Sequence, residues 1–420
     1  MKQETKFKDT EIGVIPEDWE VIDFSTVSQF KYGKMPQKTD ITDMGYPIFS
    51  GYKIVGHHKN FMYEDSKLII VARGVGGTGD VKLAPPKSYI TNLSIIANLN
   101  EQVVSKYFLK YYFYKGLRYL DSGSAQSQIT ISDLNLLKIA CPPLFEQTSI
   151  AKILSDLDSK IELLQKQNET LEAIGQALFK HWFVDFEFPN EEGKPYKSSG
   201  GEMVFYEELG KEIPKGWEVG KLGDILSELE SGSRPKGGIS DTDTDVPSIG
   251  AENILGLGKY NYSSTKYVSE KFYQKMKAGK VKDGDVLLYK DGAKLGRKSM
   301  FMCGFPFKKC CINEHVFILR NNNRLNQPFL FFWLDQKWVT KEIRNLNANS
   351  AQPGINKTTV SSLKVLIPEI NILNNYYELQ SPLLIKLFKN SLNIQTISKT
   401  RDLLLPKLMS GKIRVPVEVE

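Results

Sequence analysis

The chain contains two related copies of one long sequence, and this repeat constrains its fold more than any other feature. Ser-Ala-Gln at 124–126 returns at 350–352, and Leu-Lys followed by Ile or Val at 137–139 returns at 363–365. Both pairs have the same offset without a gap, and one shared offset over such a distance is not expected by chance. The repeat predicts two similar modules rather than one large fold.

A second motif indicates where each copy begins. Ile-Pro-x-x-Trp-Glu-Val at 15–21 returns at 213–219. This offset is shorter than the one near the end of each copy, so the second copy carries extra residues in its middle. Two such copies predict modules related by a pseudo-two-fold axis, an arrangement suited to a target that has two parts.

The composition indicates a globular protein of two or three domains. The chain has 420 residues, of which 41% are hydrophobic and 25% are charged, as in ordinary globular proteins. No apolar run approaches the roughly 20 residues that a membrane-spanning helix needs, and the first residues lead into no apolar signal core. We therefore expect a cytoplasmic protein.

No constellation of residues predicts catalysis, a metal site or a bound cofactor. The four cysteines do not make a disulfide framework for a chain of this length, and Cys310 and Cys311 are adjacent rather than spaced as zinc ligands are. Residues 74–79 match G-x-G-x-x-G, but Pro85 and Pro86 exclude the helix that a dinucleotide site requires. The sequence therefore favours recognition over turnover.

Each module is predicted to be rich in β-strands, with one aromatic helix. Residues 67–72 and 285–289 are short apolar runs typical of buried strands. Residues 107–114 and 329–338 combine aromatic side chains with helical spacing, which indicates helices that pack into a core.

Between and after the modules, hydrophobic residues repeat every seven positions, which predicts two long helices that pair as a coiled coil. The first seam includes Leu157, Ile161, Leu164, Asn168 and Leu171. The second seam follows the first at the same sequence offset that separates the motifs at the end of each copy, so the two seams are in register. It includes Leu383, Leu387, Asn390, Ile394 and Ile397.

If the two helices pair antiparallel, we expect the register that joins the two polar seam residues, Asn168 and Asn390, because a buried amide facing leucine loses roughly 1–3 kcal/mol of hydrogen bonding. Pro382 favours a break or kink in the second helix, which would then run from about 382 to 405.

Several polar and basic residues are candidate contacts to DNA. The net charge is +6, and a basic excess suits a polyanion, although solubility alone also explains it. Lys and Arg meet phosphates or guanine, and Gln can pair with adenine; a solvated turn or a capping role is the alternative for each. The candidates are Lys34, Gln37, Lys38, Arg73, Gln126, Gln128, Ser233, Arg234, Lys236, Lys290, Lys294, Arg297, Lys298 and Gln352.

Four motifs, taken together, resemble one protein family. They are the Ile-Pro-x-x-Trp-Glu-Val opening of each copy, Pro-Pro-Leu-Phe-Glu-Gln at 142–147, Leu-Phe-Lys-His-Trp-Phe-Val-Asp-Phe at 178–186 and Leu-Leu-Pro-Lys-Leu-Met-Ser-Gly-Lys-Ile at 404–413. Over nearly its whole length the chain resembles the specificity (S) subunit of Type I restriction-modification enzymes.

This resemblance implies an α+β fold: two similar mixed α/β target recognition domains, joined by two long helices that form an antiparallel coiled coil. The expected segments are a first recognition domain at 1–142, a central spacer helix at 143–186, a linker at 187–203, a second recognition domain at 204–368, and a C-terminal spacer helix and tail at 369–420. A spacer helix from 155 to 180 would be roughly 39 Å long, about one turn of DNA.

The resemblance also implies a non-catalytic subunit whose two domains each bind one half of a bipartite site in double-stranded DNA. Two copies of a modification (methyltransferase) subunit would bring S-adenosylmethionine, and restriction subunits would bring ATP and Mg, while this chain would bind no cofactor itself. Two alternatives are the recognition part of a single-chain restriction-methylation enzyme and a coiled-coil scaffold that does not bind DNA. The sequence lacks the Asn-Pro-Pro-aromatic or Asp-Pro-Pro-aromatic motif of a methyltransferase, which argues against the single-chain enzyme.

Overall fold

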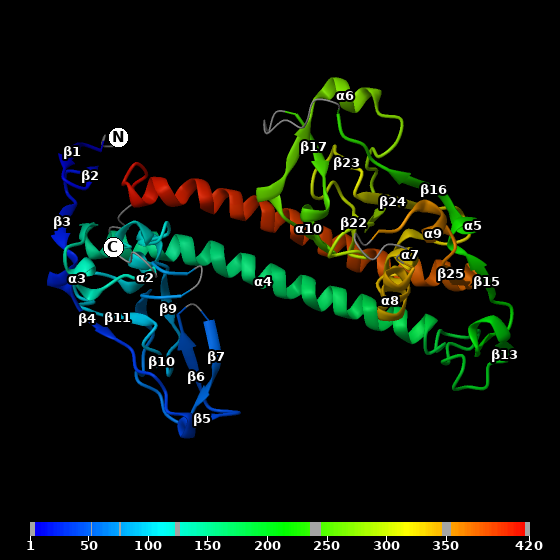
Figure 1. Ribbon diagram of the computed structural model, residues 1–420, viewed down its shortest axis with the longest axis horizontal. Coiled ribbons are helices and arrows are strands. Elements are labelled where there is room, and N and C mark those ends of the chain that lie inside the picture. Colours follow the sequence, from blue (N-terminus) through cyan, green and yellow to red (C-terminus); the bar gives the residue numbers. More distant parts are fainter. Residues whose placement is uncertain are drawn as a thin grey trace. The chain divides into compact units, whose positions relative to one another are not determined.

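The computed structural model describes residues 5–51, 53–74, 77–121, 127–235, 245–346 and 354–415. The chain forms two compact units. The first contains residues 1–160 and 397–420, and the second contains residues 161–396. Two long helices, α4 (Leu144–Phe183) and α10 (Ile370–Met409), contribute to both units (Figure 1).

The first unit is built on two four-stranded sheets and two strand pairs. One sheet is antiparallel in the order β4-β11-β8-β9, and the other has the order β10-β6-β7-β5, with β10 parallel to β6. The strands are β1 (Phe7–Thr10), β2 (Gly13–Pro16), β3 (Glu20–Asp23), β4 (Ser28–Tyr32), β5 (Ile41–Thr42), β6 (Tyr46–Ser50), β7 (Lys53–His58), β8 (Lys67–Val71), β9 (Val81–Ala84), β10 (Tyr89–Ile90), β11 (Ser94–Leu99) and β12 (Lys138–Cys141). The short helices are α1 (Phe24–Val27), α2 (Lys106–Tyr112) and α3 (Ile131–Asn135), with 3-10 turns η1 (Lys38–Asp40) and η2 (Arg118–Leu120).

The second unit repeats this plan with extra elements. Its four-stranded antiparallel sheet has the order β16-β24-β21-β22, beside a three-stranded sheet β20-β17-β23. The strands are β13 (Met203–Tyr206), β14 (Lys211–Pro214), β15 (Glu218–Lys221), β16 (Leu226–Ser231), β17 (Val246–Ile249), β18 (Ile254–Gly256), β19 (Lys259–Tyr260), β20 (Lys266–Val268), β21 (Asp285–Tyr289), β22 (Lys298–Phe301), β23 (Cys311–Ile312), β24 (Val316–Asn321) and β25 (Lys364–Ile367). The helices are α5 (Leu222–Ile225), α6 (Glu270–Lys275), α7 (Gln327–Leu334), α8 (Lys337–Asn345) and α9 (Lys357–Ser361), with η3 (Glu207–Leu209), η4 (Ala251–Asn253) and η5 (Tyr262–Ser264).

The repeat predicted from the sequence is present element by element. Strand β3 pairs with β12 as β15 pairs with β25, and the two four-stranded sheets have the same order of equivalent strands. Helices α4 and α10 are each 40 residues long, and their first residues, Leu144 and Ile370, are equivalent positions of the two copies. A surface ion pair is repeated as well: Lys138 to Glu11 and Lys364 to Glu208, each at 2.7 Å.

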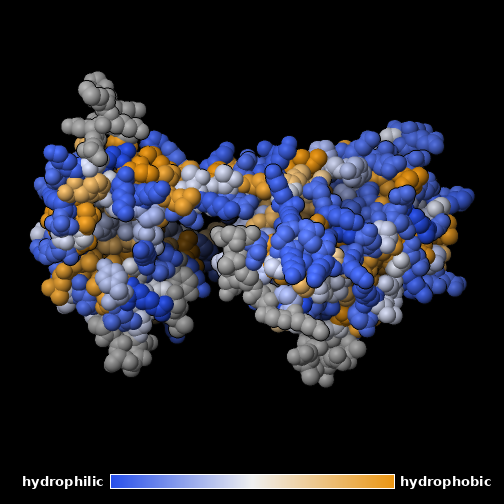
Figure 2. Space-filling view, turned by 90° about the horizontal axis from the view of Figure 1, so that it is seen from above, coloured by the Kyte–Doolittle hydropathy of each residue, from blue (hydrophilic) through white to orange (hydrophobic). Residues whose placement is uncertain are grey.

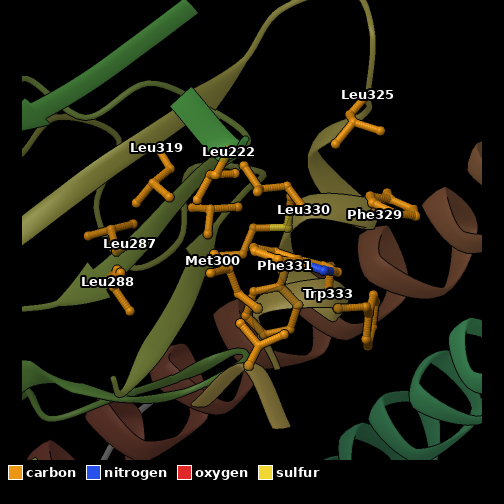
Figure 3. Close-up of a cluster of buried hydrophobic side chains, with 14 of the residues drawn as sticks. Leu222, Leu287, Leu288, Met300, Leu319, Leu325, Phe329, Leu330, Phe331 and Trp333 are labelled. Atoms are coloured by element: carbon orange, nitrogen blue, oxygen red, sulfur yellow. The ribbon is translucent and has the colours of Figure 1, made fainter. Parts of the chain in front are cut away.

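The predicted strands lie in the module cores. The predicted aromatic helix 107–114 corresponds to α2, whereas the predicted 329–338 is divided between α7, which ends at Leu334, and α8, which begins at Lys337. Strand β8 begins at Lys67 and has four buried apolar residues, and β21 covers the predicted 285–289. In the second unit, α7 is buried from Pro328 to Leu334 and packs on the four-stranded sheet. Figure 3 shows its side chains Phe329, Leu330, Phe331 and Trp333 with Leu287, Leu288, Met300 and Leu319 of the sheet. An unbroken run of apolar residues therefore marks a helix that is buried on every side.

Within the second unit, α4 and α10 run antiparallel. Asn168 donates to Ser391 at 3.0 Å. Toward the C-terminal end of α4, Phe183 packs edge-on against Tyr376, which lies toward the N-terminal end of α10. Asn390 donates to Gln167 at 3.3 Å. Each predicted amide thus bonds to the residue beside the other, which confirms the antiparallel register, although the described residues hold no direct bond between the two amides.

The predicted seam of α4 is largely correct, and that of α10 is shifted in part. Ile161, Leu164 and Asn168 are buried, and Leu157 and Leu171 are half-buried. On α10, Leu387 and Asn390 are buried, whereas Leu383, Ile394 and Ile397 are half-buried and Leu384, Phe388 and Ser391 are buried instead. The shift occurs because the module itself also packs on α10: Ser391 donates to the carbonyl of Gly258, in the turn between β18 and β19.

The predicted break at Pro382 was wrong, because α10 is one continuous helix from Ile370 to Met409. Proline lacks the N–H that would bond the carbonyl one turn earlier, and that carbonyl belongs to Glu378. Both Pro382 and Glu378 are exposed, so water can satisfy the carbonyl and the ring meets no packed neighbour.

In the first unit, the tail after α10 packs against the start of α4. Arg414 pairs with Glu146 at 2.8 Å and with Asp18 at 2.6 Å, and the Trp19 indole N–H donates to Glu146 at 3.0 Å. Arg401 pairs with Asp158 at 2.8 Å in the same antiparallel sense. The hydrogen bond from Arg414 lowers the pKa of the Asp18 carboxyl.

Hydrophobic residues are enclosed in the module cores. The face shown in Figure 2 is mainly hydrophilic, with hydrophobic residues in small separate patches, which is the usual surface of a globular protein. None of the helices that the structure describes is both long and apolar enough to cross a membrane.

Candidate nucleic-acid interface

Several of the predicted contact residues meet at one edge of the four-stranded sheet in the first unit. Strand β4 ends beside the start of β11, where Tyr32 is opposite Ile95, and β8 also ends there, where Val71 is opposite Ser94. The segments that follow β4 and β8 therefore leave the sheet at the same place. We call this place the first edge; its residues are Lys34, Met35, Arg73, Asn92, Leu93 and Gln128.

Backbone hydrogen bonds fix the first edge around the turn before β11. The backbone amide of Lys34 donates to the carbonyl of Ile90 at 3.0 Å, and the backbone amide of Arg73 donates to the carbonyl of Leu93 at 3.4 Å. Arg73 also forms a β-bridge with Gln128. Lys34 and Arg73 are exposed and Gln128 is half-buried, so these side chains are available to a ligand.

The glycine at the start of this loop is required by the protein's own backbone. An added Cβ at Gly33 would lie 2.3 Å from the carbonyl oxygen of Thr91. At the equivalent Gly232 a Cβ would lie 1.8 Å from the carbonyl oxygen of Ile312. The two glycines therefore let the chain cross its own backbone.

The second unit has an equivalent edge with different chemistry. Ser231 at the end of β16 is opposite Phe317, and Tyr289 at the end of β21 is opposite Val316, both at the start of β24. Asp291 forms a β-bridge with Gly354, as Arg73 does with Gln128. The second edge consists of Ser233, Arg234, Asp291, Glu314, His315 and Gly354, each equivalent in position to one residue of the first.

The charged side chains of the second edge form a connected network. Arg234 pairs with Glu314 at 2.8 Å, and the two ring nitrogens of His315 face Glu314 at 3.4 Å and Asp291 at 2.9 Å. The four side chains are between 34% and 43% exposed. Burial raises the pKa of the neighbouring Tyr289 phenol, and the Asp291 carboxylate raises it further, so the phenol stays neutral at physiological pH.

The remaining predicted residues lie around the edges or outside the described residues. Lys290 donates to the Ser231 hydroxyl at 3.2 Å and lies over the Phe317 ring. Gln37, Lys38 and Lys294 are exposed, and no contact of the described chain ties them to an edge. Gln126, Lys236 and Gln352 lie outside the described residues.

Two predicted contacts are structural instead. Lys298 is buried, and its ammonium donates to the carbonyl of Leu334 at 2.8 Å and to the Thr340 hydroxyl at 2.7 Å. Burial lowers the pKa of Lys298, although Asp335 opposes this shift. Arg297 donates to the carbonyl of Ile254 at 2.9 Å. All four residues of strand β22 are buried, so the side chain of Lys298 is enclosed within the module.

Sequence reasoning missed Asp291, Glu314 and His315. His315 follows the adjacent cysteines in the sequence, but Cys310 and Cys311 are buried among strands and helices. In the described part of the chain no group of three or more His, Cys, Asp or Glu side chains is placed to hold a metal ion. The available signal was positional: Asp291 follows the predicted strand 285–289 as Arg73 follows the strand 67–72.

Comparison with known proteins connects both modules to one family. The sequence model of that family, described as the Type I restriction modification DNA specificity domain, matches residues 16–173 and 214–400. The two matches begin at Pro16 and Pro214, which end the equivalent strands β2 and β14.

Individual relatives match two thirds or more of the chain. The chain is 29% identical to the Type I restriction enzyme MjaIX specificity subunit of Methanocaldococcus jannaschii, over 98% of this chain and 97% of that protein. It is 26% identical to the HindI specificity subunit of Haemophilus influenzae, over 68% and 71%. The crystal structure of a Type I restriction-modification S subunit from M. genitalium has the same fold, with a TM-score of 0.66, 20% identity and coverage of 93% and 96%.

Proposed function

Because this chain belongs to the Type I restriction modification DNA specificity family, we propose that it is the DNA-recognition subunit of such a complex and that each module binds one half of a bipartite site. The observation that carries the proposal is the pair of equivalent edges. They occupy the same place in the two modules, and no equivalent pair of edge residues shares a residue type.

The chemistry of the edges suits this role. A scaffold that is repeated while its edge side chains differ is what recognition of two unlike half-sites requires. Arg73 and Gln128 can pair with guanine and adenine in the major groove, and Lys34 can meet a phosphate. Lys38, Lys294 and Ser233 are exposed and can add contacts to the DNA backbone.

The long helices fit a spacer that sets the distance between the half-sites. Antiparallel pairing within each unit, supported by the Asn168 to Ser391 and Arg401 to Asp158 contacts, gives the pair one defined register. The exposed faces of α4 and α10 would then dock two modification subunits, which bring S-adenosylmethionine, and restriction subunits with ATP and Mg would complete the complex. The chain itself would be non-catalytic and cytoplasmic.

Selection from a random duplex pool tests the proposal. The chain is assembled with its modification partner, and the bound duplexes are sequenced. A motif of two short specific halves with a gap of constant length is expected. A single continuous motif, or no enrichment, would contradict the assignment, as would methyl transfer by this chain alone.

A further inference from the structure

We propose that the two edges recognise base pairs of opposite hydrogen-bonding polarity at their equivalent positions, and that the Asp291 carboxylate accepts a hydrogen bond from the exocyclic amino group of a base. This inference rests on the proposed function and adds the chemical class that the second module recognises. Two bases offer such a group in the major groove, cytosine through N4 and adenine through N6.

Arg73 and Asp291 occupy equivalent backbone positions in the two modules. Arg73 and Asp291 each stand two residues beyond the end of equivalent strands, and each forms a β-bridge to the segment before the last short helix of its module. The partners are Gln128 and Gly354. The two side chains therefore begin from the same backbone position. If Arg73 contacts a base of its half-site, Asp291 contacts the base at the equivalent position of the other half-site.

The side chains of Arg73 and Asp291 have opposite hydrogen-bonding character. An arginine guanidinium only donates hydrogen bonds, and an ionised carboxylate only accepts them. Arg73 consequently suits the O6 and N7 acceptors of guanine, whereas Asp291 suits an amino donor. A second pair of equivalent positions differs in the same way. Asn92 of the first edge, which can donate and accept hydrogen bonds, corresponds to Glu314 of the second, whose carboxylate only accepts them.

Neighbouring side chains hold the Asp291 carboxylate in place. Both oxygens of Asp291 lie near Nδ1 of His315, at 3.0 and 2.9 Å, and His315 is in turn flanked by Glu314, which Arg234 holds. One ring N–H uses only part of the acceptor capacity of a carboxylate, which offers about four lone-pair sites. The side chain of Asp291 is 34% exposed, so part of a carboxylate that His315 holds in place stays accessible to a ligand.

Electrostatics exclude a general role for these carboxylates in holding DNA. An acidic group that meets the phosphate backbone is repelled, because the backbone attracts lysine and arginine. Acidic residues at a DNA interface gain energy chiefly from amino groups on base edges. Arg234 and Lys290 offset the local negative charge, which lets Asp291 approach the groove.

The test uses the complex with the modification partner and the bipartite site obtained by selection. In the second-module half, each adenine in turn is replaced by purine and each cytosine by 2-pyrimidinone, both of which lack the amino group. One such replacement is expected to weaken wild-type binding roughly 5- to 150-fold, and its identity tells adenine from cytosine.

The variant arm locates the effect. Asp291→Ala should bind the intact site and the amino-deleted site equally, while Asp291→Asn checks that the module still folds. Arg73→Ala, the matched control at the equivalent position, should keep the full penalty in the second half. The inference is overturned if no deletion weakens wild-type binding, or if Asp291→Ala keeps the same penalty. Failure of the proposed function differs from both, since no bipartite site would then be selected.

Discussion

Glu146 illustrates how much of the first module depends on single residues. Its carboxylate is 1% exposed and accepts from the Trp19 indole and from the Arg414 guanidinium. Glu146→Gln removes the charge but keeps the shape. Because hydrogen bonds to charged groups contribute about 1.5–3 kcal/mol, we expect the free energy of unfolding to fall by about 1–3 kcal/mol.

Denaturant unfolding of the full chain measures this loss. Glu17→Gln is the matched control, because Glu17 carries the same charge, lies beside Asp18 and is exposed. A loss no larger than that of the control would show that the Trp19 and Arg414 contacts contribute no stability.

The pairing of Asp18 with Arg414 predicts a pH dependence. The folded pKa of Asp18 lies below its ordinary value of 3.8 because Arg414 donates to the carboxylate. The stabilisation is therefore complete above about pH 3.8 and is lost as the pH falls through the lower folded pKa. The difference in Tm between wild type and Asp18→Asn should be constant from pH 7 to 5 and should narrow below about pH 4. A difference that widens on acidification would give the opposite sign and contradict the pairing.

At single residues, the sequence indicates which positions follow a strand, but it does not show which partners a side chain will meet; the contacts of Arg73 and Gln128 to DNA stay a prediction. Arg73 and Gln128 were predicted as contacts, and the structure brings them together at one edge. Lys298 was also predicted, but its ammonium is buried against Leu334 and Thr340. Those partners belong to elements much later in the chain, so no local sequence pattern around Lys298 predicts them.

Among the elements, the helix pair depends on one glycine. A Cβ at Gly175 of α4 would lie 2.5 Å from Nε2 of Gln380 and 2.6 Å from Cζ of Phe332, which is buried in the core. Overpacking costs about 1–3 kcal/mol, whereas alanine gains about 0.5–1 kcal/mol over glycine in a helix. Gly175→Ala should therefore lower the free energy of unfolding by about 1 kcal/mol.

Thr170→Ala is the control for this helix, because Thr170 is exposed and alanine there should be neutral or slightly stabilising. If Gly175→Ala stabilises the protein as well, α4 and α10 do not pack this closely.

Pro382 offers a test on α10. Alanine restores the N–H that can bond the carbonyl of Glu378, and proline in a helix interior costs about 3 kcal/mol relative to alanine. Pro382→Ala should raise the free energy of unfolding by roughly 1–3 kcal/mol, measured against Lys386→Ala on the same exposed face. No gain would mean that the helix has already relaxed around the proline.

The elements were predictable where a period or an apolar run is long. The heptad spacing predicted both long helices, the two seam amides predicted the register of their antiparallel pairing, and apolar runs predicted β8 and β21. The continuous course of α10 through Pro382 was not predictable, because it depends on which face of the helix the module leaves exposed. The part of the seam that shifted to Leu384 and Ser391 depends likewise on the turn at Gly258.

For the whole molecule, one repeated scaffold carries two equivalent edges, with Arg73 in one and Arg234 in the other, and we propose that each edge binds one half of the DNA site. Each arginine that contacts a base edge should contribute about 1–3 kcal/mol at its own half-site.

The most direct measurement is the sequence preference of the assembled complex with Arg73→Ala and, separately, with Arg234→Ala, selected from the same random duplex pool. Each variant should relax one half of the motif and leave the other half and the gap unchanged. If either variant weakens both halves equally, or lowers affinity for all duplexes alike, the edges contact only phosphates and the assignment of one half-site to each module is contradicted.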